Sequence, residues 1–338
     1  MNFLPIFNIE LSNTHSVLPH DTYGRDFGLF IKDHLPYVLG SNLTGIVQEL
    51  GPGTTSYTIG QHIYGLGNCL GPLPDSNGLQ EYALLETNTS AVVPDGFTDD
   101  QMVTLPINAN TSFAALFHPN WLGFPPPFST KARNFDYAAQ SIVIIGAGSN
   151  CGKLAIQFAK IAGIGMIIAV ASLSGEKLLR ELGATHVVDR NSKSVVAEVK
   201  TICGGVHGRE EVTHVYDCVN GSFELATEMV SNTKKSVITV LRPTQSAVEE
   251  LKKRGKSEIS TVSTVSGAKN NFDVETAKLF WDNLGKWVVE GKVSIPTFRI
   301  VEGLDVALVN EALDSYRKLN GVPQVVVHPS GNGNGNGK

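Results

Sequence analysis

Hydrophobic and polar positions change their pattern along the chain, and the first pattern extends to about residue 115. Short apolar runs alternate here with turns rich in Gly, Pro and Asn, which is typical of β-strands joined by short connections. The predicted strands lie in TGIVQELG, HIYGLG, EYALLE and SAVVP. Within Phe97–Phe117, Thr98 and the two aspartates after it form a predicted helix N-cap, and helical spacing follows. This pattern predicts a small β-rich module.

From Gln140 to about Ser266 the pattern alternates between strand and helix. The strand-like runs are SIVIIG, MIIAVAS, HVVD, HVYDCV and SVITVL. The helix-like runs between them are CGKLAIQFAKIAG, GEKLLRELG and LATEMVS. Alternation of this kind predicts the α/β fold class with a doubly wound parallel sheet. The predicted order ends with a helix at Thr276–Glu290, the strand-like PTFRIV, a helix at Leu304–Leu319 and the strand-like QVVVH.

Length, charge and cysteine spacing limit the classes of function. A chain of 338 residues is long enough for two domains, and a net charge of −5 offers no basic surface for nucleic acid. The four cysteines are widely spaced without a CxxC pair, which indicates reduced thiols and a cytoplasmic protein. No apolar run is long enough to span a bilayer and the first residues lack a basic signal segment, so we expect no membrane partner. The Gly/Asn-rich tail, 331–338, is predicted to be disordered.

The segment Ser141–Lys160 combines a β-branched strand, a glycine-rich turn and an amphipathic helix. This order suits a dinucleotide, because small residues let backbone N–H groups approach the pyrophosphate and the helix N-terminus attracts its charge. The glycines follow G-x-G-x-x-x-G rather than the usual G-x-G-x-x-G, which puts Ser149 where the middle glycine is expected. An ordinary strand–turn–helix would show the same pattern, so that alternative stays open. The residues predicted to bind the cofactor here are Gly146, Gly148, Ser149, Asn150, Cys151 and Gly152.

The end of the next strand bears on which nucleotide is bound. An NAD site places Asp or Glu there, about 20 residues beyond the glycines, to bind the ribose hydroxyls. Here the strand ends in Ala-Ser-Leu-Ser, and no acid follows it before Glu176. Ser172, Ser174, Lys177 and Arg190 can instead hold a 2′-phosphate through charge-assisted hydrogen bonds. These residues predict NADPH as the cofactor; the alternative is that Lys177 and Arg190 are solvated surface charges.

Several motifs resemble the medium-chain dehydrogenase/reductase superfamily and occur in that family's order. They are VLGSNLTGIVQELGPGTTSYTIGQHIYG, ALLETNTSAVVPDGFTDDQMVTLP, the glycine turn, LRELGATHVVD and VYDCV. The resemblance implies a bilobal enzyme with its active site between the lobes. It assigns 1–116 and 267–330 to a β-rich GroES-like catalytic domain and 117–266 to a central Rossmann domain. Because few residues precede His15, it also predicts an N-terminally shortened catalytic domain with unpaired strand edges.

The residue types at that family's zinc positions argue against a metal. A catalytic zinc needs three protein ligands from Cys, His and Asp or Glu. The zinc alcohol dehydrogenases have Gly-His-Glu where this chain has Gly-Ser-Asn at 40–42, and their third ligand is matched by Ile107. Cys69 stands alone in its region, so the four-cysteine structural lobe is missing as well. We therefore predict no metal, and expect His20 to lie at the active-site edge or on the surface.

Without zinc, the resemblance narrows to the quinone reductases, the fungal trans-acting enoyl reductases and related secondary-metabolite dehydrogenases. It implies an NADPH-dependent reductase of an activated C=C bond in a small or polyketide-derived carbonyl compound, in which the carbonyl stabilises the developing enolate. Tyr23 matches a tyrosine that lines the nicotinamide site and is the predicted catalytic residue, donating to the substrate oxygen; alternatively it only packs against the cofactor. Thr111 matches a threonine under the nicotinamide, and Val240 and Leu241 are expected near its carboxamide.

Leu18 takes the place of an asparagine that hydrogen-bonds near the nicotinamide in relatives. Two other functions therefore stay open: a non-redox cyclase or isomerase on the same scaffold, and an NADPH-binding protein without turnover. In each case the expected partner is a small molecule, and the protein is expected to be a monomer or a homodimer.

Overall fold

The computed structural model describes residues 6–67, 74–204, 211–219, 223–240, 245–258, 260–264, 274–318 and 322–329. The chain forms two units, one of residues 1–107 and 273–338 and the other of residues 108–272. The sequence predicts domain limits after residues 116 and 266, and this division stays a prediction. Leu241 and the tail 331–338 lie outside the described residues.

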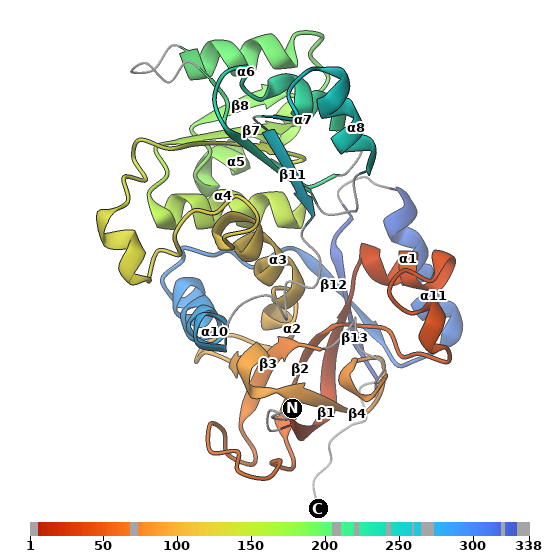
Figure 1. The fold of residues 1–338 in the computed structure, drawn as a ribbon. Coiled ribbons are helices and arrows are strands. Elements are labelled where there is room, and N and C mark those ends of the chain that lie inside the picture. The colour runs from red at the N-terminus through yellow and green to blue at the C-terminus, as the bar shows by residue number, and fades with distance from the viewer. Residues whose placement is uncertain are drawn as a thin grey trace, which may run out of the picture. The chain divides into compact units, whose positions relative to one another are not determined.

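The first unit is built around a sheet that uses strands from both ends of the chain (Figure 1). Among the described residues its strand order is β12-β13-β1-β2-β3-β5, and β4 also pairs with β1. The strands are β1 (Ile6–Val17), β2 (Asn42–Val47), β3 (His62–Leu66), β4 (Tyr82–Glu86), β5 (Ser90–Val92), β12 (Phe298–Glu302) and β13 (Gln324–His328). The helices are α1 (Pro19–Phe27), α2 (Asp99–Met102), α10 (Val274–Val289) and α11 (Val306–Ser315).

Strand β1 holds this sheet together, because it runs antiparallel to β13, β2 and β4. Thr14, His15 and Ser16, just before its last residue, are polar but buried. The Thr14 hydroxyl donates to Asp100 Oδ1 at 3.1 Å. Ser16 Oγ accepts from Gln324 Nε2 at 2.6 Å. A polar segment can occupy an interior position only when its buried groups are paired in this way.

The helical spacing expected through Phe97–Phe117 is interrupted in the structure. Thr98 caps α2 as predicted, and its hydroxyl accepts a hydrogen bond from Gln101 N. Helix α2 ends at Met102, however, and α3 (Pro106–Phe117) begins at a proline. Proline lacks an N–H and has a fixed φ, so it suits the first turn of a helix and not its interior. The start of the helix was therefore predicted correctly, and its continuity wrongly.

The second unit contains a parallel sheet with the order β11-β10-β9-β6-β7-β8 (Figure 1). Its strands are β6 (Ser141–Ile145), β7 (Met166–Ala171), β8 (His186–Asp189), β9 (His214–Asp217), β10 (Ser236–Val240) and β11 (Ser260–Thr264). Its helices, apart from α3, are α4 (Asn150–Ala162), α5 (Glu176–Leu182), α6 (Val195–Gly204), α7 (Phe223–Met229) and α8 (Gln245–Lys253). Short 3₁₀ helices of the two units lie at Lys32–His34, Pro74–Ser76, Thr87–Thr89, Thr130–Asn134, Leu173–Gly175 and Tyr316–Lys318. The predicted α/β fold class is confirmed.

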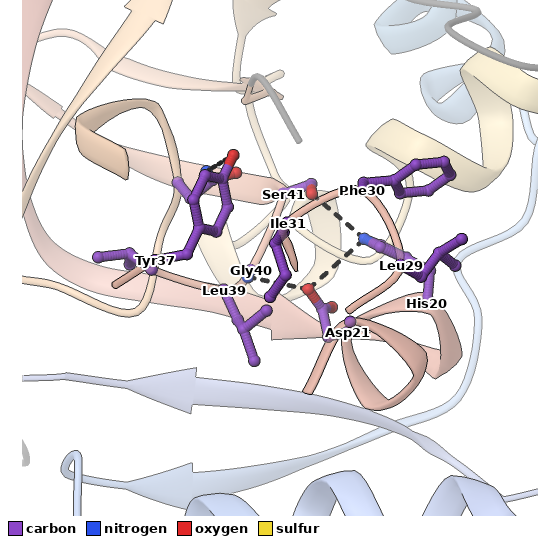
Figure 2. Close-up of a pocket in the computed structure, with 12 residues that line it drawn as sticks. His20, Asp21, Leu29, Phe30, Ile31, Tyr37, Leu39, Gly40 and Ser41 are labelled. Atoms are coloured by element: carbon purple, nitrogen blue, oxygen red, sulfur yellow. Dashed lines mark hydrogen bonds and ion pairs between the residues drawn. The ribbon is translucent and has the colours of Figure 1, made fainter. Parts of the chain in front are cut away.

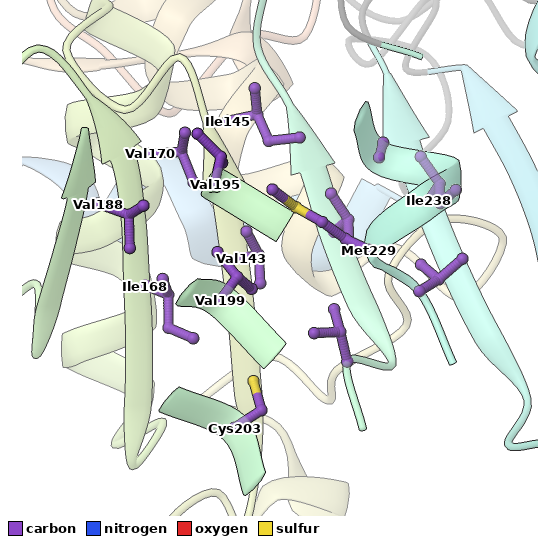
Figure 3. Close-up of a cluster of buried hydrophobic side chains, with 14 of the residues drawn as sticks. Val143, Ile145, Ile168, Val170, Val188, Val195, Val199, Cys203, Met229 and Ile238 are labelled. Atoms are coloured by element: carbon purple, nitrogen blue, oxygen red, sulfur yellow. The ribbon is translucent and has the colours of Figure 1, made fainter. Parts of the chain in front are cut away.

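The central strands of this sheet are buried on both faces. Every residue of β6 and β7 is buried. Figure 3 shows one face, where aliphatic side chains of β6, β7 and β8 pack with those of α6. Parallel strands covered on both faces appear in the sequence as continuous apolar runs, which is why these strands could be predicted. None of the helices in the described part of the chain is apolar and long enough to cross a membrane.

Candidate functional site

The glycine turn lies where the strand order of the parallel sheet reverses. Strand β6 lies between β9 and β7. The strands that follow it in the sequence therefore lie on both sides of it, with β7 and β8 on one side and β9, β10 and β11 on the other. In open parallel sheets, ligands bind beyond the carboxyl ends of the strands at such a switch point. Gly146 follows β6 and Val219 follows β9, and a Cβ built on Gly146 would lie 2.5 Å from Val219 Cγ1. The two segments therefore meet at the expected binding edge.

Two glycines of the turn are required by the fold itself. Gly146 has a φ of +73°, in the left-handed region that favours glycine. A Cβ on Gly152 would lie 2.6 Å from both Ala147 Cα and the Gly146 carbonyl oxygen. Ser149 caps α4, because its hydroxyl accepts a hydrogen bond from Gly152 N at 3.0 Å. The shifted spacing of the motif thus leaves the close approach of helix and turn intact.

Gly148 differs from these two glycines, because the protein's own packing does not require it. No described heavy atom lies within 4 Å of the place where its Cβ would be, and its φ lies outside the left-handed region. Other glycines of the chain also face open space, but at Gly148 that space lies in the turn just before the N-terminus of α4. The turn therefore fits a pyrophosphate lying against its backbone, beside the partial positive charge of the α4 N-terminus.

The two cysteines next to the turn are not suited to nucleophilic chemistry. Cys151 is the second residue of α4, and its Sγ lies 3.4 Å from Asn108 Oδ1. Burial raises the pKa of Cys151 to about 11 and raises that of Cys218 well above its ordinary value. Both thiols stay protonated near neutral pH, and the thiolate is the reactive form. Cys151 can serve a nucleotide only through its position in the first turn of α4.

Three of the residues predicted to bind a 2′-phosphate meet at the carboxyl ends of β7 and β8. The Ser172 and Ser174 hydroxyl oxygens are 3.0 Å apart. Arg190 N donates to the Ala171 carbonyl at 2.9 Å, which places Arg190 beside the end of β7. The Arg190 side chain is exposed. The structure thus brings two hydroxyls and one cation to one edge of the sheet.

Lys177, the fourth predicted residue, lies in the first turn of α5 and is exposed. The acid next to it is engaged elsewhere, because Glu176 Oε1 accepts from Arg180 Nε at 2.8 Å. This ion pair along the helix holds the Glu176 carboxylate against its own helix. Glu176 is therefore not a substitute for the ribose-binding acid of an NAD site.

One carboxylate near this edge was missed in the sequence. Asp189 ends β8 and lies opposite Ala171 in the strand register. Its Oδ1 accepts a hydrogen bond from Asn191 N at 3.0 Å, so it stabilises the turn after β8. Only the register of β7 and β8 reveals this position, since the acid belongs to a later strand.

The residues predicted near the nicotinamide differ in their exposure. Thr111 lies on α3 and is half-buried. The Val240 side chain is fully buried in the core of the second unit, so Val240 can reach a cofactor only through its backbone. Leu241 lies outside the described residues. These three assignments stay predictions.

A second candidate site is a small hollow in the first unit, between the start of α1 and the segment that precedes β2 (Figure 2). His20 lines it, with Nε2 3.2 Å from Ser41 Oγ and 3.5 Å from Asp21 Oδ1. The Asp21 carboxyl is almost fully buried, whereas the His20 side chain is 19% exposed. The arrangement places a partly accessible imidazole against a buried carboxylate and a buried hydroxyl.

Asp21 is fixed by the backbone on both of its oxygens. Oδ2 accepts from Leu18 N at 2.9 Å, and Oδ1 accepts from Gly40 N at 3.0 Å. In a capping box, the residue before the helix and the third helical residue each accept a hydrogen bond from the other's backbone N–H. Leu18 precedes α1 and has no side-chain acceptor, so only the hydrogen bond from Leu18 N to the Asp21 side chain forms. The same carboxylate therefore fixes the start of α1 and the approach to β2.

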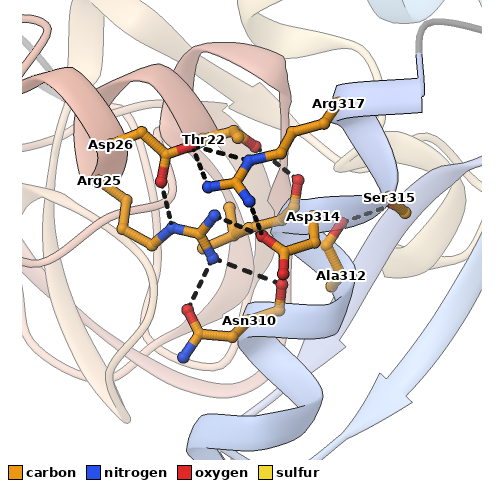
Figure 4. A network of polar contacts seen from close by, with 9 residues as sticks. Thr22, Arg25, Asp26, Asn310, Ala312, Asp314, Ser315 and Arg317 are labelled. Carbon is orange, nitrogen blue, oxygen red and sulfur yellow. Dashed lines mark hydrogen bonds and ion pairs between the residues drawn. The ribbon is translucent and has the colours of Figure 1, made fainter.

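Helix α1 is further held by a network of charged groups on α11 and after it (Figure 4). Arg25 donates to Asn310 Oδ1 at 2.7 Å and to Asp314 Oδ1 at 2.5 Å. Asp26 accepts from Arg25 Nε at 2.9 Å and from Arg317 Nη2 at 2.6 Å. The hydrogen bonds from Arg25 and Arg317 lower the pKa of Asp26. The helix that carries His20 is thus anchored on one side.

Tyr23, the predicted catalytic residue, lies on α1 and is half-buried. Its ring stacks on that of Phe27, with centroids 6.2 Å apart. Tyr23 belongs to the first unit, whereas the nucleotide turn belongs to the second. Its catalytic role stays a prediction.

The positions compared with zinc ligands have other roles. Ser41 contacts His20, as described above. Asn42 is a structural tie, since its Nδ2 donates to the Val103 carbonyl and its Oδ1 accepts from Ile107 N, both at 2.8 Å. In the described ranges, no group of three or more His, Cys, Asp or Glu side chains is placed to hold a metal ion.

The contact between His20 and Ser41 was not found from the sequence. In the sequence His20 is an isolated histidine, because Ser41 is distant along the chain. The sequence contains one sign that His20 lies near the predicted catalytic residue. His20 and Tyr23 are three residues apart on a helix, so they share a face.

Comparison with known proteins agrees with this geometry. A family model described as zinc-binding dehydrogenase matches residues 151–281. A trans-enoyl reductase of Aspergillus japonicus is 29% identical over 207 residues, which are 60% of this chain and 56% of that protein. A quinone oxidoreductase of Rattus norvegicus is 29% identical over 188 residues, which are 56% of this chain and 51% of that protein. The alignments thus span little more than half the length of these two relatives.

Solved structures share the fold over nearly the whole chain. The Escherichia coli quinone oxidoreductase, determined in complex with NADPH, has a TM-score of 0.72 at 17% identity and covers 96% of this chain and 91% of its own. An alcohol dehydrogenase superfamily protein of Novosphingobium aromaticivorans has a TM-score of 0.72 at 20% identity and covers 96% of this chain and 91% of its own. The parallel sheet with its glycine turn, the family-model match and these similarities agree with the resemblance of the motifs to the medium-chain dehydrogenase/reductase superfamily.

Proposed function

We propose that this chain is an NADPH-dependent reductase that acts without zinc on the activated C=C bond of a small or polyketide-derived carbonyl compound. The observation that carries the proposal is the open position at Gly148 in the turn between β6 and the N-terminus of α4, where a pyrophosphate can approach the backbone. The sequence similarity to a trans-enoyl reductase and a quinone oxidoreductase supports the reaction class.

Each part of the chemistry has candidate residues in this chain. A bound reduced nicotinamide supplies a hydride to the β-carbon of the substrate. The first turn of α4 offers backbone N–H groups to the pyrophosphate. Ser172, Ser174, Lys177 and Arg190 bind the 2′-phosphate. Tyr23 donates a hydrogen bond to the substrate oxygen, where negative charge develops during the reaction.

The proposal is tested by mixing the purified protein with NADPH and an α,β-unsaturated ketone. We expect the absorbance of the reduced nicotinamide to fall while a product two hydrogen atoms heavier forms, as measured by mass spectrometry. Isomerised or cyclised product without nucleotide oxidation would instead support a non-redox enzyme. Tight NADPH binding without any product would support a binding protein.

The preference for NADPH over NADH can be tested with the double variant Lys177→Glu/Arg190→Glu. Both side chains are exposed, so the fold should be unaffected. Two charge reversals beside the 2′-phosphate should raise the Kd for NADPH about 10- to 100-fold and that for NADH less than about 3-fold. Lys252→Glu, on an exposed position of α8, is the control for net charge. Equal losses for the two nucleotides would contradict the assignment.

A further inference from the structure

We propose that His20 delivers the proton to the α-carbon of the substrate, and that Asp21 and Ser41 position it. The proposal rests on the proposed function, whose reaction leaves an enolate that must be protonated. It goes beyond the expectation drawn from the family resemblance, in which Tyr23 donates to the substrate oxygen. Three features of the first unit carry it: the two faces of α1, the fixed orientation of the imidazole and the surroundings of the hollow.

One face of helix α1 is buried in the first unit, and the opposite face is more accessible. Asp21, Thr22 and Gly24 are buried in the unit. His20, Tyr23 and Phe27 recur at spacings of three and four residues, so they share the other face. Phe27 is 76% exposed although it is a large apolar side chain. This face, His20–Tyr23–Phe27, presents an imidazole beside two aromatic rings, which suits a conjugated, largely apolar substrate.

The orientation of the His20 imidazole gives its two nitrogens different roles: Nε2 contacts the protein, and Nδ1 transfers the proton. Nε2 faces Ser41 Oγ at 3.2 Å and Asp21 Oδ1 at 3.5 Å. Asp21 is held in place by two backbone N–H groups and is almost fully buried, so it cannot turn away. A proton on Nε2 is therefore retained beside the carboxylate. Nδ1 then carries the proton that can be transferred.

The backbone next to the hollow supports a functional role. Phe30 lines the hollow and has a φ of +69°, a left-handed conformation that a bulky residue rarely adopts. Its side chain is 44% exposed. Strained residues of this kind cluster at ligand-binding positions. Phe30 therefore adds a third aromatic ring to the surroundings of His20.

Protonation of the α-carbon moves one proton from His20 to the substrate. With a hydride from the reduced nicotinamide on its β-carbon, the substrate carries the former π electron pair as an enolate. The α-carbon of this enolate takes the Nδ1 proton from the His20 imidazolium and forms the new C–H bond. The neutral imidazole keeps its Nε2 proton against Asp21 and Ser41. Solvent then returns a proton to Nδ1.

The test measures stereochemistry, which a merely structural role of His20 would not change. An α-methyl-α,β-unsaturated ketone is reduced in D₂O with NADPH, and the configuration of the deuterated α-carbon is determined before the product exchanges. Wild-type protein should give one configuration. His20→Gln should give both in nearly equal amounts, with turnover about 100- to 1,000-fold lower. NADPH binding, measured by fluorescence, should be unchanged in this variant.

Tyr23→Phe is the matched control, because it removes the other side-chain donor, a hydroxyl, from the same face of α1. We expect it to keep the single configuration at the α-carbon. A single configuration from His20→Gln, or a mixture from Tyr23→Phe, would overturn the assignment of His20. Absence of reduced product from the wild-type protein would contradict the proposed function itself.

Discussion

Replacing Gly148 by valine should weaken nucleotide binding about 100-fold and leave the fold intact. The space around the missing Cβ contains no described protein atom within 4 Å, and the backbone there is not left-handed, so valine fits without strain. A pyrophosphate lying against the turn would instead meet the new methyl groups. We expect the Kd for NADPH to rise on the order of 100-fold, which corresponds to about 2.7 kcal/mol. Fluorescence titration measures the Kd, and thermal unfolding monitors the fold.

Gly152→Val is the matched contrast within the same motif. Its Cβ would lie 2.6 Å from the backbone of Ala147 and of Gly146, so the helix or the turn must move. This variant should be destabilised by about 1–3 kcal/mol, the usual cost of overpacking. If Gly148→Val were the less stable of the two, or bound NADPH normally, the assignment of the open position would be wrong.

Acidification from about pH 7 to about pH 5 should destabilise both units through one histidine in each. Burial lowers the pKa of His15 to about 3 and that of His214 to about 4, from an ordinary value of 6.5. Between the ordinary and the lowered value, the unfolded chain binds a proton that the folded chain does not. Stability is therefore complete above the ordinary value and falls as the pH drops below it. At pH 5 the loss should be about 2 kcal/mol for His15 and somewhat less for the half-buried His214.

Urea unfolding at several pH values measures this loss, with variants that cannot titrate. His214→Phe keeps an aromatic ring beside Phe124, whose centroid lies 4.5 Å from the imidazole. His15→Asn keeps a polar side chain in the first unit. Each variant should show a flatter dependence on pH than the wild-type protein. An unchanged dependence in both would mean that other groups control stability in acid.

The parallel sheet could be predicted from the sequence, whereas the strand β1 and the helix α6 could not. Strands β6 and β7 are continuous apolar runs, a local signal that buried parallel strands produce. Strand β11, STVST, lacks this signal and was not predicted. The end of β1 is polar, and its burial depends on partners such as Gln324 that are distant along the chain. Helix α6 contains β-branched residues that favour strands, although Val195, Val199 and Cys203 recur at helical spacing and are buried.

In the candidate site, too, features set by neighbouring residues could be predicted, and features set by residues distant along the chain could not. The glycine turn is a local motif, so its residues could be identified without a structure. The role of Gly148 as the open position could not, because it depends on what surrounds a missing Cβ. His20 had no assigned role for the same reason: its partner Ser41 comes from another segment, and only the folded chain brings the two together.

The pairing of β1 with β13 also has a consequence for the order in which the chain can fold. Ser16 and Gln324 are 308 residues apart in the sequence, and the whole second unit lies between them. On the ribosome, the sheet of the first unit cannot be completed until synthesis has passed the second unit. The second unit is contiguous and can fold as soon as it emerges. Once folded, it shortens the loop whose closure the β1–β13 pairing requires and so lowers the entropic cost of that pairing.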